Sequence, residues 1–319
     1  IGQQGTLPRR DLFAGKGYLP ITLMQFLRGC AFSCTYCAVS VFFDRRTHVR
    51  RIDDVLREID AARPRMIFFV DDNIVADRRA AKDLFRELIP YRLRWVSQAS
   101  IDMTRDPELM DVMTRSGCMG HVIGFESISE SSLRSMAKTP NLHGGASGYR
   151  EPIRVLRDHG LQTWAAFTLG HDHDTVDSVR ATLDFAMQNK FAFAAFNILV
   201  PYPNTPLYRS LEREGRLLYD GKWWLHPDYR FNHAAFVPRN MDPETLTTEC
   251  FRCRSQFNSV GSILRRFLDP RTNLRSLARM ALYWSYAPLF RKEVFKKQGM
   301  RFGGGPRNER AIHTKSPAP

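Results

Sequence analysis

The sequence predicts an α/β fold, a partial (β/α)6 TIM-like barrel followed by a mainly helical C-terminal extension. Three observations predict it. Six short apolar runs recur between residues 21 and 200, longer helical patterns separate them, and each run is followed by polar residues or glycine. Short apolar runs that alternate with helical patterns are typical of a parallel sheet. Six such units in a row would form three quarters of a barrel.

The predicted strands are the six apolar runs, which in chain order span residues 21–27, 66–70, 94–100, 121–125, 162–169 and 194–200. The predicted helices lie between and after them, at residues 52–62, 77–88, 107–116, 129–137 with 151–159, 175–188 and 206–214. Asp106 and Pro107 suit an N-cap and a first helical position, and Gly117 and Gly160 lie where helices should end.

The loops after the predicted strands contain most of the candidate functional residues. In parallel βα barrels the chemistry lies in these loops, at the carboxyl ends of the strands. In chain order they contain the cysteine-rich stretch 27–37, then Asp71-Asp72-Asn73, Gln98 with Ser100, Gly124-Phe125-Glu126-Ser127, Gly170-His171-Asp172-His173-Asp174, and Pro201-Tyr202-Pro203-Asn204-Thr205-Pro206. Six polar loops in register predict a functional site at one edge of the sheet.

The first loop carries three cysteines, Cys30, Cys34 and Cys37, in a C-x3-C-x2-C spacing. Three thiolates on one tight loop can hold three irons of a [4Fe-4S] cluster and leave the fourth iron open for a small molecule. Structural zinc normally has four protein ligands, and the nearest further candidate, His48, does not complete the set cleanly. The spacing therefore favours an iron–sulfur cluster over zinc.

This motif, with an aromatic residue before the last cysteine, resembles the signature of radical S-adenosylmethionine (radical SAM) enzymes. The resemblance implies that Cys30, Cys34 and Cys37 bind the cluster and that SAM chelates the open iron. An electron from the cluster would then cleave SAM to a 5′-deoxyadenosyl radical. It also implies that the backbone at Tyr36 contacts the adenine.

The same resemblance assigns roles to the next loops. Asp71, Asp72 and Asn73 occupy the segment that hydrogen-bonds the amino group of SAM in this family, and the alternative is that they are ordinary turn residues. Glu126 resembles the ribose-binding glutamate. The remaining assignments are less specific: Gln98 and Ser100 fit SAM or the substrate, or are satisfied polar residues at a strand end.

The loop from Gly170 to Asp174 contains two imidazoles and two carboxylates, which raises the alternative of a second metal site. Alternate residues of an extended segment point in opposite directions, so His171 and His173 are not expected to converge. Asp174 is predicted to be the N-cap of the next helix. Gly170 is grouped with the SAM-binding residues, and His171 is a candidate proton donor or acceptor for the substrate.

The stretch 201–206 resembles a Pro-Tyr-Pro-Gly-Thr-Pro loop of radical SAM proteins that carry a cobalamin-binding domain, with Asn204 in place of glycine. Asn204 tolerates the left-handed backbone conformation that glycine would otherwise supply. That subgroup includes methylases of unactivated carbon, among them hopanoid-lipid enzymes. The sequence contains no Asp-x-His-x-x-Gly cobalamin signature, so a cobalamin cofactor would require a domain not present in this chain.

Four regions are expected from these patterns. Residues 1–18 resemble the linker that follows such a cobalamin domain, 19–215 form the barrel, 216–302 are aromatic-rich and helical, and 303–319 are expected to be disordered. A helical pattern from about residue 243 to 267 contains Cys250 and Cys253, which could hold an auxiliary cluster only with ligands from elsewhere, such as Cys118. The auxiliary cluster is the less favoured interpretation.

The net charge of +14 is concentrated at the end of the chain, where residues 261–319 contain 13 Lys and Arg against 3 Asp and Glu. With the aromatic residues of 273–302, this composition fits peripheral contact with an anionic membrane, packing on the barrel, or a solvated surface. A near-neutral barrel and no recognisable RNA-binding module do not favour nucleic acid. Six cysteines without a disulfide framework indicate a cytoplasmic protein, and no apolar run approaches a membrane span.

The sequence thus predicts a radical SAM enzyme, with a cobalamin-dependent methyltransferase as one form of it. The expected substrate is a lipid or another natural product, and the expected reductant is a flavodoxin or ferredoxin. A tRNA-modifying radical SAM enzyme and a non-catalytic metal- or RNA-binding module are the alternatives.

Overall fold

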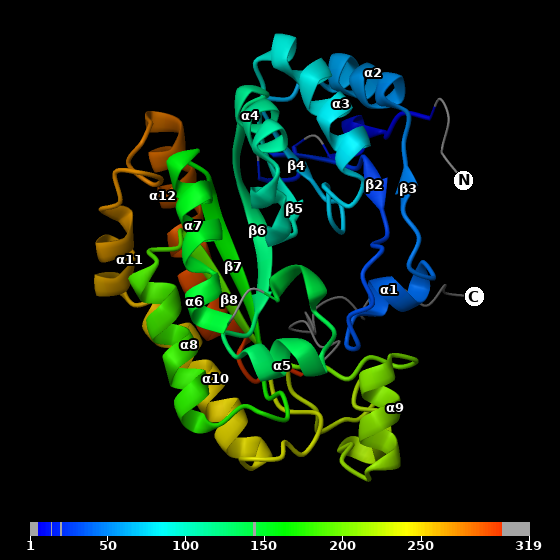
Figure 1. The fold of residues 1–319 in the computed structure, drawn as a ribbon, viewed down its shortest axis with the longest axis vertical. Coiled ribbons are helices and arrows are strands. Elements are labelled where there is room, and N and C mark those ends of the chain that lie inside the picture. Colours follow the sequence, from blue (N-terminus) through cyan, green and yellow to red (C-terminus); the bar gives the residue numbers. More distant parts are fainter. Residues whose placement is uncertain (1–5, 14, 20, 143–144, 302–319) are drawn as a thin grey trace, which may run out of the picture.

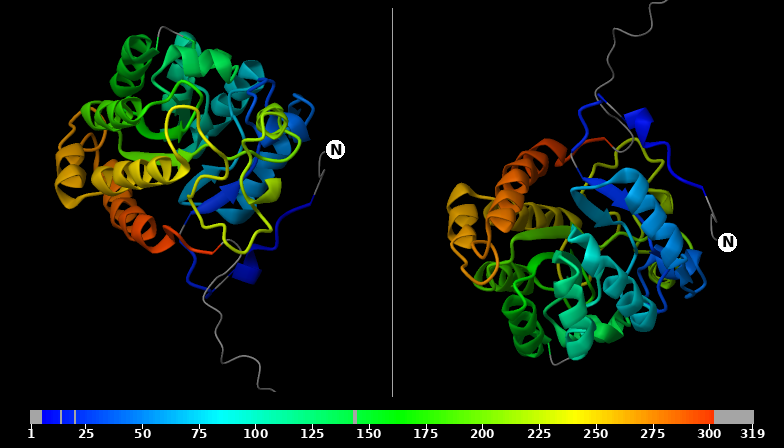
Figure 2. Two further views of the ribbon diagram at one scale, coloured as in Figure 1. Left: turned by 90° about the horizontal axis from the view of Figure 1, so that it is seen from below. Right: turned by 90° about the horizontal axis from the view of Figure 1, so that it is seen from above.

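The computed structural model describes residues 6–13, 15–19, 21–142 and 145–301. Residues 1–5 of the expected linker and the whole of the expected disordered tail, 303–319, lie outside the described residues. The described chain forms a curved sheet with helices around its outside (Figures 1 and 2).

The six predicted strands form one parallel sheet in the order β1-β4-β5-β6-β7-β8, so the predicted α/β barrel-like architecture is confirmed. Their bounds are β1 (Thr22–Met24), β4 (Met66–Phe69), β5 (Arg94–Ala99), β6 (Cys118–Glu126), β7 (Gln162–Leu169) and β8 (Phe193–Ile198). Each strand therefore ends at the same edge of the sheet, next to the loops that carry the candidate residues.

The first strand is shorter than predicted, because the chain leaves the sheet after Met24. The amides of Phe26 and Leu27 donate hydrogen bonds to the Asp71 carboxylate, in the loop after β4, instead of to a neighbouring strand. The chain then forms an unpredicted antiparallel pair, β2 (Leu27–Arg28) with β3 (His48–Val49), on either side of the cysteine loop.

The predicted helices are present, with ends that differ by a few residues at most. The helices of the chain are α1 (Ala38–Phe42), α2 (Ile52–Ala62), α3 (Arg78–Leu88), α4 (Pro107–Arg115), α5 (Glu130–Ser135), α6 (Gly145–Gly148), α7 (Arg150–Asp158), α8 (Val176–Gln188), α9 (Pro206–Arg213), α10 (Pro243–Phe257), α11 (Val260–Phe267) and α12 (Leu277–Lys297). Asp106 caps α4 by accepting a hydrogen bond from the Leu109 amide at 3.0 Å, as predicted. Gly117 and Gly160, after α4 and α7, have φ of +93° and +70°.

The two faces of the sheet differ in burial. On the outer face, Ile67, Trp95, Ile123 and Phe167 are 0 % exposed because helices cover them. On the inner face, the alternate residues, such as Phe68 in β4, remain partly exposed. The close-packed core therefore lies between the sheet and its helices, and the inside of the barrel is less completely filled.

The C-terminal region packs on the barrel. The helical pattern predicted as one helix from 243 to 267 is two helices, because Ser259 interrupts it and caps α11 through its hydroxyl. Helix α10 packs against α8 and β8, and on α12 the Tyr283 ring stacks on Phe193 of β8. Among the described residues, no helix combines the length and the apolar character needed to cross a bilayer.

Candidate active site

The cysteine loop begins with a sharp turn at Gly29, whose φ is +83°. A Cβ atom at this position would collide with the backbone oxygen of Arg46, so a side chain is excluded on two grounds. The turn leads the chain from β2 into the cysteine loop, which lies beside α5 on its way to α1 (Figure 1).

Two carboxylates of the second loop hold this turn. Asp71 Oδ1 accepts hydrogen bonds from the Phe26 amide at 2.7 Å and the Leu27 amide at 2.9 Å. Asp72 Oδ2 accepts from the Gly29 amide at 2.7 Å. Both side chains are therefore engaged with the cysteine loop, and a part for this segment in binding SAM stays a prediction.

Asp71 gives a testable pH dependence. Burial raises the pKa of this carboxyl to about 7, even though two backbone amides lower it. Because its pKa in the unfolded chain is about 3.9, the folded state holds the proton more tightly, and stability contributed by the protonated form is lost as the pH rises from about 4 to 7. We expect the free energy of unfolding to fall there by about 1.4 kcal/mol per pH unit relative to Asp71→Asn.

Denaturant unfolding of the two proteins at a series of pH values would measure this difference. Asp83→Asn, at a half-exposed position on α3, is the matched control and should show no comparable pH dependence. A difference between Asp71→Asn and the unaltered chain that is constant with pH would contradict the prediction.

The cysteine loop is also fixed by two later loops. The Thr35 amide donates to the Met136 carbonyl, which follows α5, and the Leu207 amide at the start of α9 donates to the Thr35 carbonyl, both at 3.0 Å. The preceding turn has Asn204 in the predicted left-handed conformation, with φ of +65°. The loops after β1, β6 and β8 are therefore joined by backbone hydrogen bonds around the cysteines.

The three thiols fit the expected cluster in number and chemistry. Cys34 is 6 % exposed, whereas Cys30 and Cys37 are partly exposed. Burial raises the pKa of Cys34 to about 11, and metal binding would replace its proton. The described residues contain no group of three His, Cys, Asp or Glu side chains close enough to hold one metal ion. A cluster, unlike one ion, separates its thiolates by its own width.

Glu126 lies at the end of β6 in a left-handed conformation with φ of +64°, where the register with β7 is interrupted. Gly124 leaves room for its carboxylate, because a Cβ atom there would collide with Glu126 Oε1. Thr168 donates to Oε2 at 3.3 Å, and the Tyr36 hydroxyl interacts with the same carboxylate. The bulge thus directs a buried carboxylate toward the cysteine loop.

Lys138 was not among the residues that the sequence pointed to. Its Nζ lies 3.2 Å from Glu126 Oε1, and the side chains of the two residues are 15 % and 10 % exposed. Burial lowers the pKa of Lys138, but attraction to Glu126 and to the thiols of Cys34 and Cys37 outweighs it, so the pKa is raised. In the sequence, a lysine just after a helix is an ordinary terminal charge, and nothing distinguished it.

Asn73 and Ser100 contact each other across two loops. Asn73 Nδ2 donates to Ser100 Oγ, and the Ser100 amide donates to Asn73 Oδ1, both at 3.1 Å. Asn73 also interacts with the Cys30 thiol. Gln98, by contrast, contributes its backbone carbonyl, which accepts from the Ile74 amide at 3.0 Å, while its side chain is partly exposed on the inner face.

The prediction that Asp174 caps the next helix is wrong. Its carboxylate accepts from the amides of Gly170 and His171 and from the Ser132 hydroxyl, because the turn after β7 leaves those donors unpaired. Thr175 caps α8 instead, in a capping box with Ser178.

His171 is buried, and its Nε2 lies 2.9 Å from Thr168 Oγ1. The Thr168 hydroxyl also contacts Glu126, so Thr168 lies between the imidazole and that carboxylate. Burial lowers its pKa, so the ring is neutral at neutral pH. His173 is exposed, and Asp172 pairs with Arg216 and Arg239. The two histidines thus lie in different environments, and Gly170 holds the turn with φ of +101°.

The other three cysteines lie in the core. The Cys250 thiol contacts the Phe196 carbonyl of β8, the Cys253 thiol contacts the Val179 carbonyl of α8, and Cys118 lies next to His121. Each thiol is directed at a different part of the packing between sheet and helices. The three side chains therefore contribute to the packing of the core.

A family model described as the radical SAM superfamily matches residues 24–186. The bacteriochlorophyllide d C-12(1)-methyltransferase of Chlorobaculum tepidum is 28% identical over 79% of this chain and 54% of its own length. The hopanoid C-2 methylase of Rhodopseudomonas palustris is 26% identical over 72% of this chain and 45% of its own length. The chain therefore spans about half the length of these curated relatives.

Two solved structures share the fold. One is the radical S-adenosylmethionine methyltransferase TsrM from Kitasatospora setae, with cobalamin and a [4Fe-4S] cluster bound. Its TM-score is 0.53 and its sequence identity is 20%, and the match covers 61% of this chain and 37% of TsrM. The other is the cobalamin-dependent S-adenosylmethionine radical enzyme OxsB, with aqua-cobalamin and S-adenosylmethionine bound. Its TM-score is 0.56 and its sequence identity is 14%, and the match covers 85% of this chain and 46% of OxsB.

Proposed function

This chain belongs to the radical SAM superfamily, whose members use a [4Fe-4S] cluster and SAM, and we propose that Cys30, Cys34 and Cys37 hold that cluster. When bound, the cluster supplies the electron that cleaves SAM to methionine and a 5′-deoxyadenosyl radical. The radical would abstract hydrogen from an unactivated C–H bond, which has no proton acidic enough for a side-chain base.

The observation that carries this proposal is the arrangement of charges around the cysteine loop. Lys138 and Glu126 form a buried ion pair beside the thiols, and Lys138 offsets the negative charge that thiolates would bring. The Glu126 carboxylate has the acceptor oxygens that ribose hydroxyls require. Tyr36 interacts with Glu126, so a nucleoside held by Glu126 would lie against the loop.

The reaction we propose is methylation, or a related modification, of a lipid or another natural product. The two curated relatives above are named as a bacteriochlorophyllide d methyltransferase and a hopanoid methylase, which supports methylation at carbon of a lipid or another natural product. A cobalamin cofactor would be held by a domain not present in this chain. A flavodoxin or ferredoxin is the proposed electron donor in a cytoplasmic setting.

Anaerobic reconstitution with iron and sulfide, followed by SAM and a strong reductant, tests the proposal. Mass spectrometry would quantify 5′-deoxyadenosine and S-adenosylhomocysteine, with and without added cobalamin. Deoxyadenosine is the expected product, and S-adenosylhomocysteine in addition would identify a methylase. Neither product, from protein with a full cluster, would contradict the proposal.

We also propose that the outer face of α11 and α12 contacts an anionic membrane. Two apolar stripes lie side by side there, since the Phe267 and Trp284 rings are 4.9 Å apart. The exposed large apolar side chains of this region are Val260, Leu264, Leu268, Leu277, Trp284, Leu289 and Phe295. The exposed cations around them are Arg265, Lys292, Lys296 and Lys297. An apolar stripe with flanking cations is the pattern of an interfacial helix.

Co-sedimentation with phosphatidylglycerol–phosphatidylcholine vesicles tests this surface. We expect binding that falls with added salt and is lost when Leu264 and Leu268 are both replaced by Glu. Leu225→Glu, at a more exposed site elsewhere, should bind like the unaltered chain. No binding to the anionic vesicles would contradict the proposed membrane contact.

A further inference from the structure

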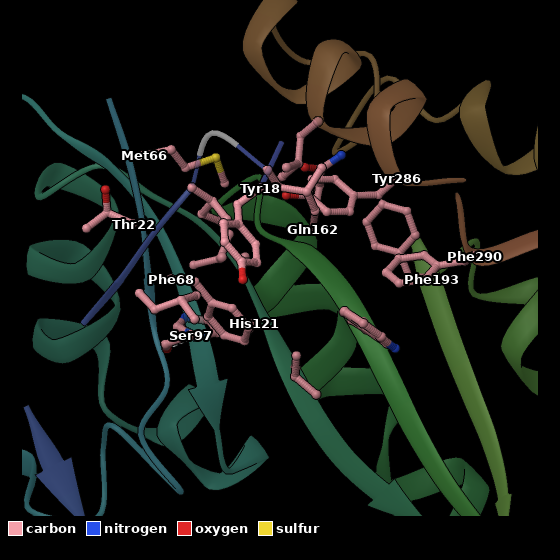
Figure 3. Close-up of a pocket in the computed structure, with 18 of the residues that line it drawn as sticks. Tyr18, Thr22, Met66, Phe68, Ser97, His121, Gln162, Phe193, Tyr286 and Phe290 are labelled. Atoms are coloured by element: carbon pink, nitrogen blue, oxygen red, sulfur yellow. Dashed lines mark hydrogen bonds between the residues drawn. The ribbon is translucent and has the colours of Figure 1, made fainter. Parts of the chain in front are cut away.

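A cavity of about 990 Å³ lies inside the barrel, at the end opposite the cysteine loop. Its walls are the inner face of the sheet, the N-terminal segment before β1, and the inward side of α12. Figure 3 shows side chains from these walls, among them Tyr18, Phe68 and Tyr286, around one common space. Its volume is at the upper end of the range for ligand pockets, which is about 300–1,000 Å³.

The strand register explains why this space is open. One row of paired residues crosses the sheet from β1 to β7 and consists of Leu23, Phe68, Val96, Gly120 and Gln162. Paired residues of neighbouring strands share a face, so these five residues lie on the inner face. The fourth residue of this row, in β6, is glycine. A Cβ atom at Gly120 would collide with the Gln162 backbone, so no side chain can fill the space from that position.

The lining of the cavity is apolar. The next row, Val122, Trp164 and Phe193, adds two aromatic rings, and α12 adds Tyr286 and Phe290. These inner residues stay partly exposed, in contrast to the fully buried residues of the outer face. A hydrocarbon that covered them would remove apolar surface from water, which is the main favourable contribution to binding in such a pocket.

The charged group in the lining is already neutralised. The Arg10 guanidinium donates to the Glu58 carboxylate and to the Leu23 carbonyl. An anionic ligand would therefore have to compete with Glu58 for Arg10. The lining favours an uncharged apolar molecule.

Two polar atoms of the described lining have no hydrogen-bond partner: Arg10 Nε, which is a donor, and Gln162 Oε1, which is an acceptor. The Gln162 side-chain amide nitrogen donates to Asn273 Oδ1 at 3.0 Å and to the Arg279 carbonyl at 3.2 Å. Its oxygen, Oε1, has no hydrogen-bond partner among the described residues, although the residue is only 3 % exposed. A buried acceptor left unpaired is costly, so a ligand hydroxyl that donated to it would be favoured.

We propose that this cavity holds the hydrocarbon body of a lipid-like substrate, with a hydroxyl of that molecule donating to Gln162 Oε1. Val122 in the cavity wall lies four residues before Glu126 on β6, which is about 13 Å along the strand. A molecule anchored at Gln162 can therefore extend through the barrel toward the proposed cluster. This inference rests on the proposed function, because it names the substrate class of that site.

Segments of the chain itself are less suited to the cavity. Residues 302–319 contain Arg307, Glu309, Arg310 and Lys315, and residues 1–5 contain two glutamines and two glycines. Charged groups in an apolar space would be left without partners. Either segment would nevertheless exclude added ligands, so its presence is an outcome of the test.

Fluorescence titration with the uncharged methyl ester of cis-parinaric acid, and competition by farnesol and by the hydrocarbon farnesene, test the inference on the intact chain. We expect saturable binding, weakened about tenfold or more by Val122→Phe and by Val96→Phe, each of which adds bulk to the cavity. Val237→Phe, at an exposed position, is the matched control. Farnesol should compete better than farnesene, and Gln162→Met should remove that preference.

Thermal unfolding would show that the variants are folded. No saturable binding, or equal binding by Val122→Phe and Val237→Phe, would overturn the inference and leave the cavity to a chain segment or to no ligand. Deoxyadenosine formation, measured on the same samples, reports separately on the proposed function. Its presence without probe binding would overturn the cavity inference alone, and its absence with probe binding would overturn the proposed function alone.

Discussion

We expect the replacement of Cys34 by alanine to abolish cluster incorporation and deoxyadenosine formation. This is the first of the two variants for which we expect the largest effects. Cys34 is the middle thiol of the loop and the most buried of the three. With two thiolates left, the cluster would lose one of its three protein ligands and SAM cleavage would lose its electron source. The iron and sulfide content of the protein and its yield of deoxyadenosine would both fall to background.

The matched control for this variant is Cys253→Ala. Cys253 is as buried as Cys34, but its thiol contacts the Val179 carbonyl on the outer side of the sheet. We expect this variant to lose some stability, because it leaves a small cavity, and to keep its cluster. Full iron content and deoxyadenosine formation by Cys34→Ala would exclude the proposed ligand set.

Breaking the Lys138–Glu126 pair is the second large effect. Lys138→Met leaves the Glu126 carboxylate buried without its cation, and we expect a loss of about 3–5 kcal/mol in the free energy of unfolding. Glu126→Gln leaves Lys138 unpaired in the same way. The double variant, which has no buried charge at either position, should regain most of the stability of the unaltered chain.

Among the Glu126 and Lys138 variants, the affinity for SAM should not change in parallel with the free energy of unfolding. If Glu126 and Lys138 serve the site, the double variant remains unable to bind or cleave SAM even though it folds well. Denaturant unfolding and equilibrium binding of SAM to the reconstituted protein would separate the two effects. Recovery of SAM cleavage in the double variant would show that the pair is structural only.

The order of strands and helices could be predicted because it depends on local patterns. A run such as 162–169 is bounded by Gly160 and Gly170, and β7 has the same ends as the predicted strand. Helix α2 also has its predicted ends, since its apolar positions recur at helical spacing. Errors occurred where a distant side chain competes for backbone amides, as Asp71 does at the end of β1.

By itself the sequence determined the fold class, the cysteine loop and the family, because each depends on residue types at fixed spacings along the chain. Only the tertiary structure decided which side chains meet. It turned Asp71 and Asp72 toward the cysteine loop and brought Lys138 to Glu126. Hydrogen bonds and ion pairs between loops depend on distances across the sheet, and these are fixed by strand register and packing, which leave no periodic signal in the sequence.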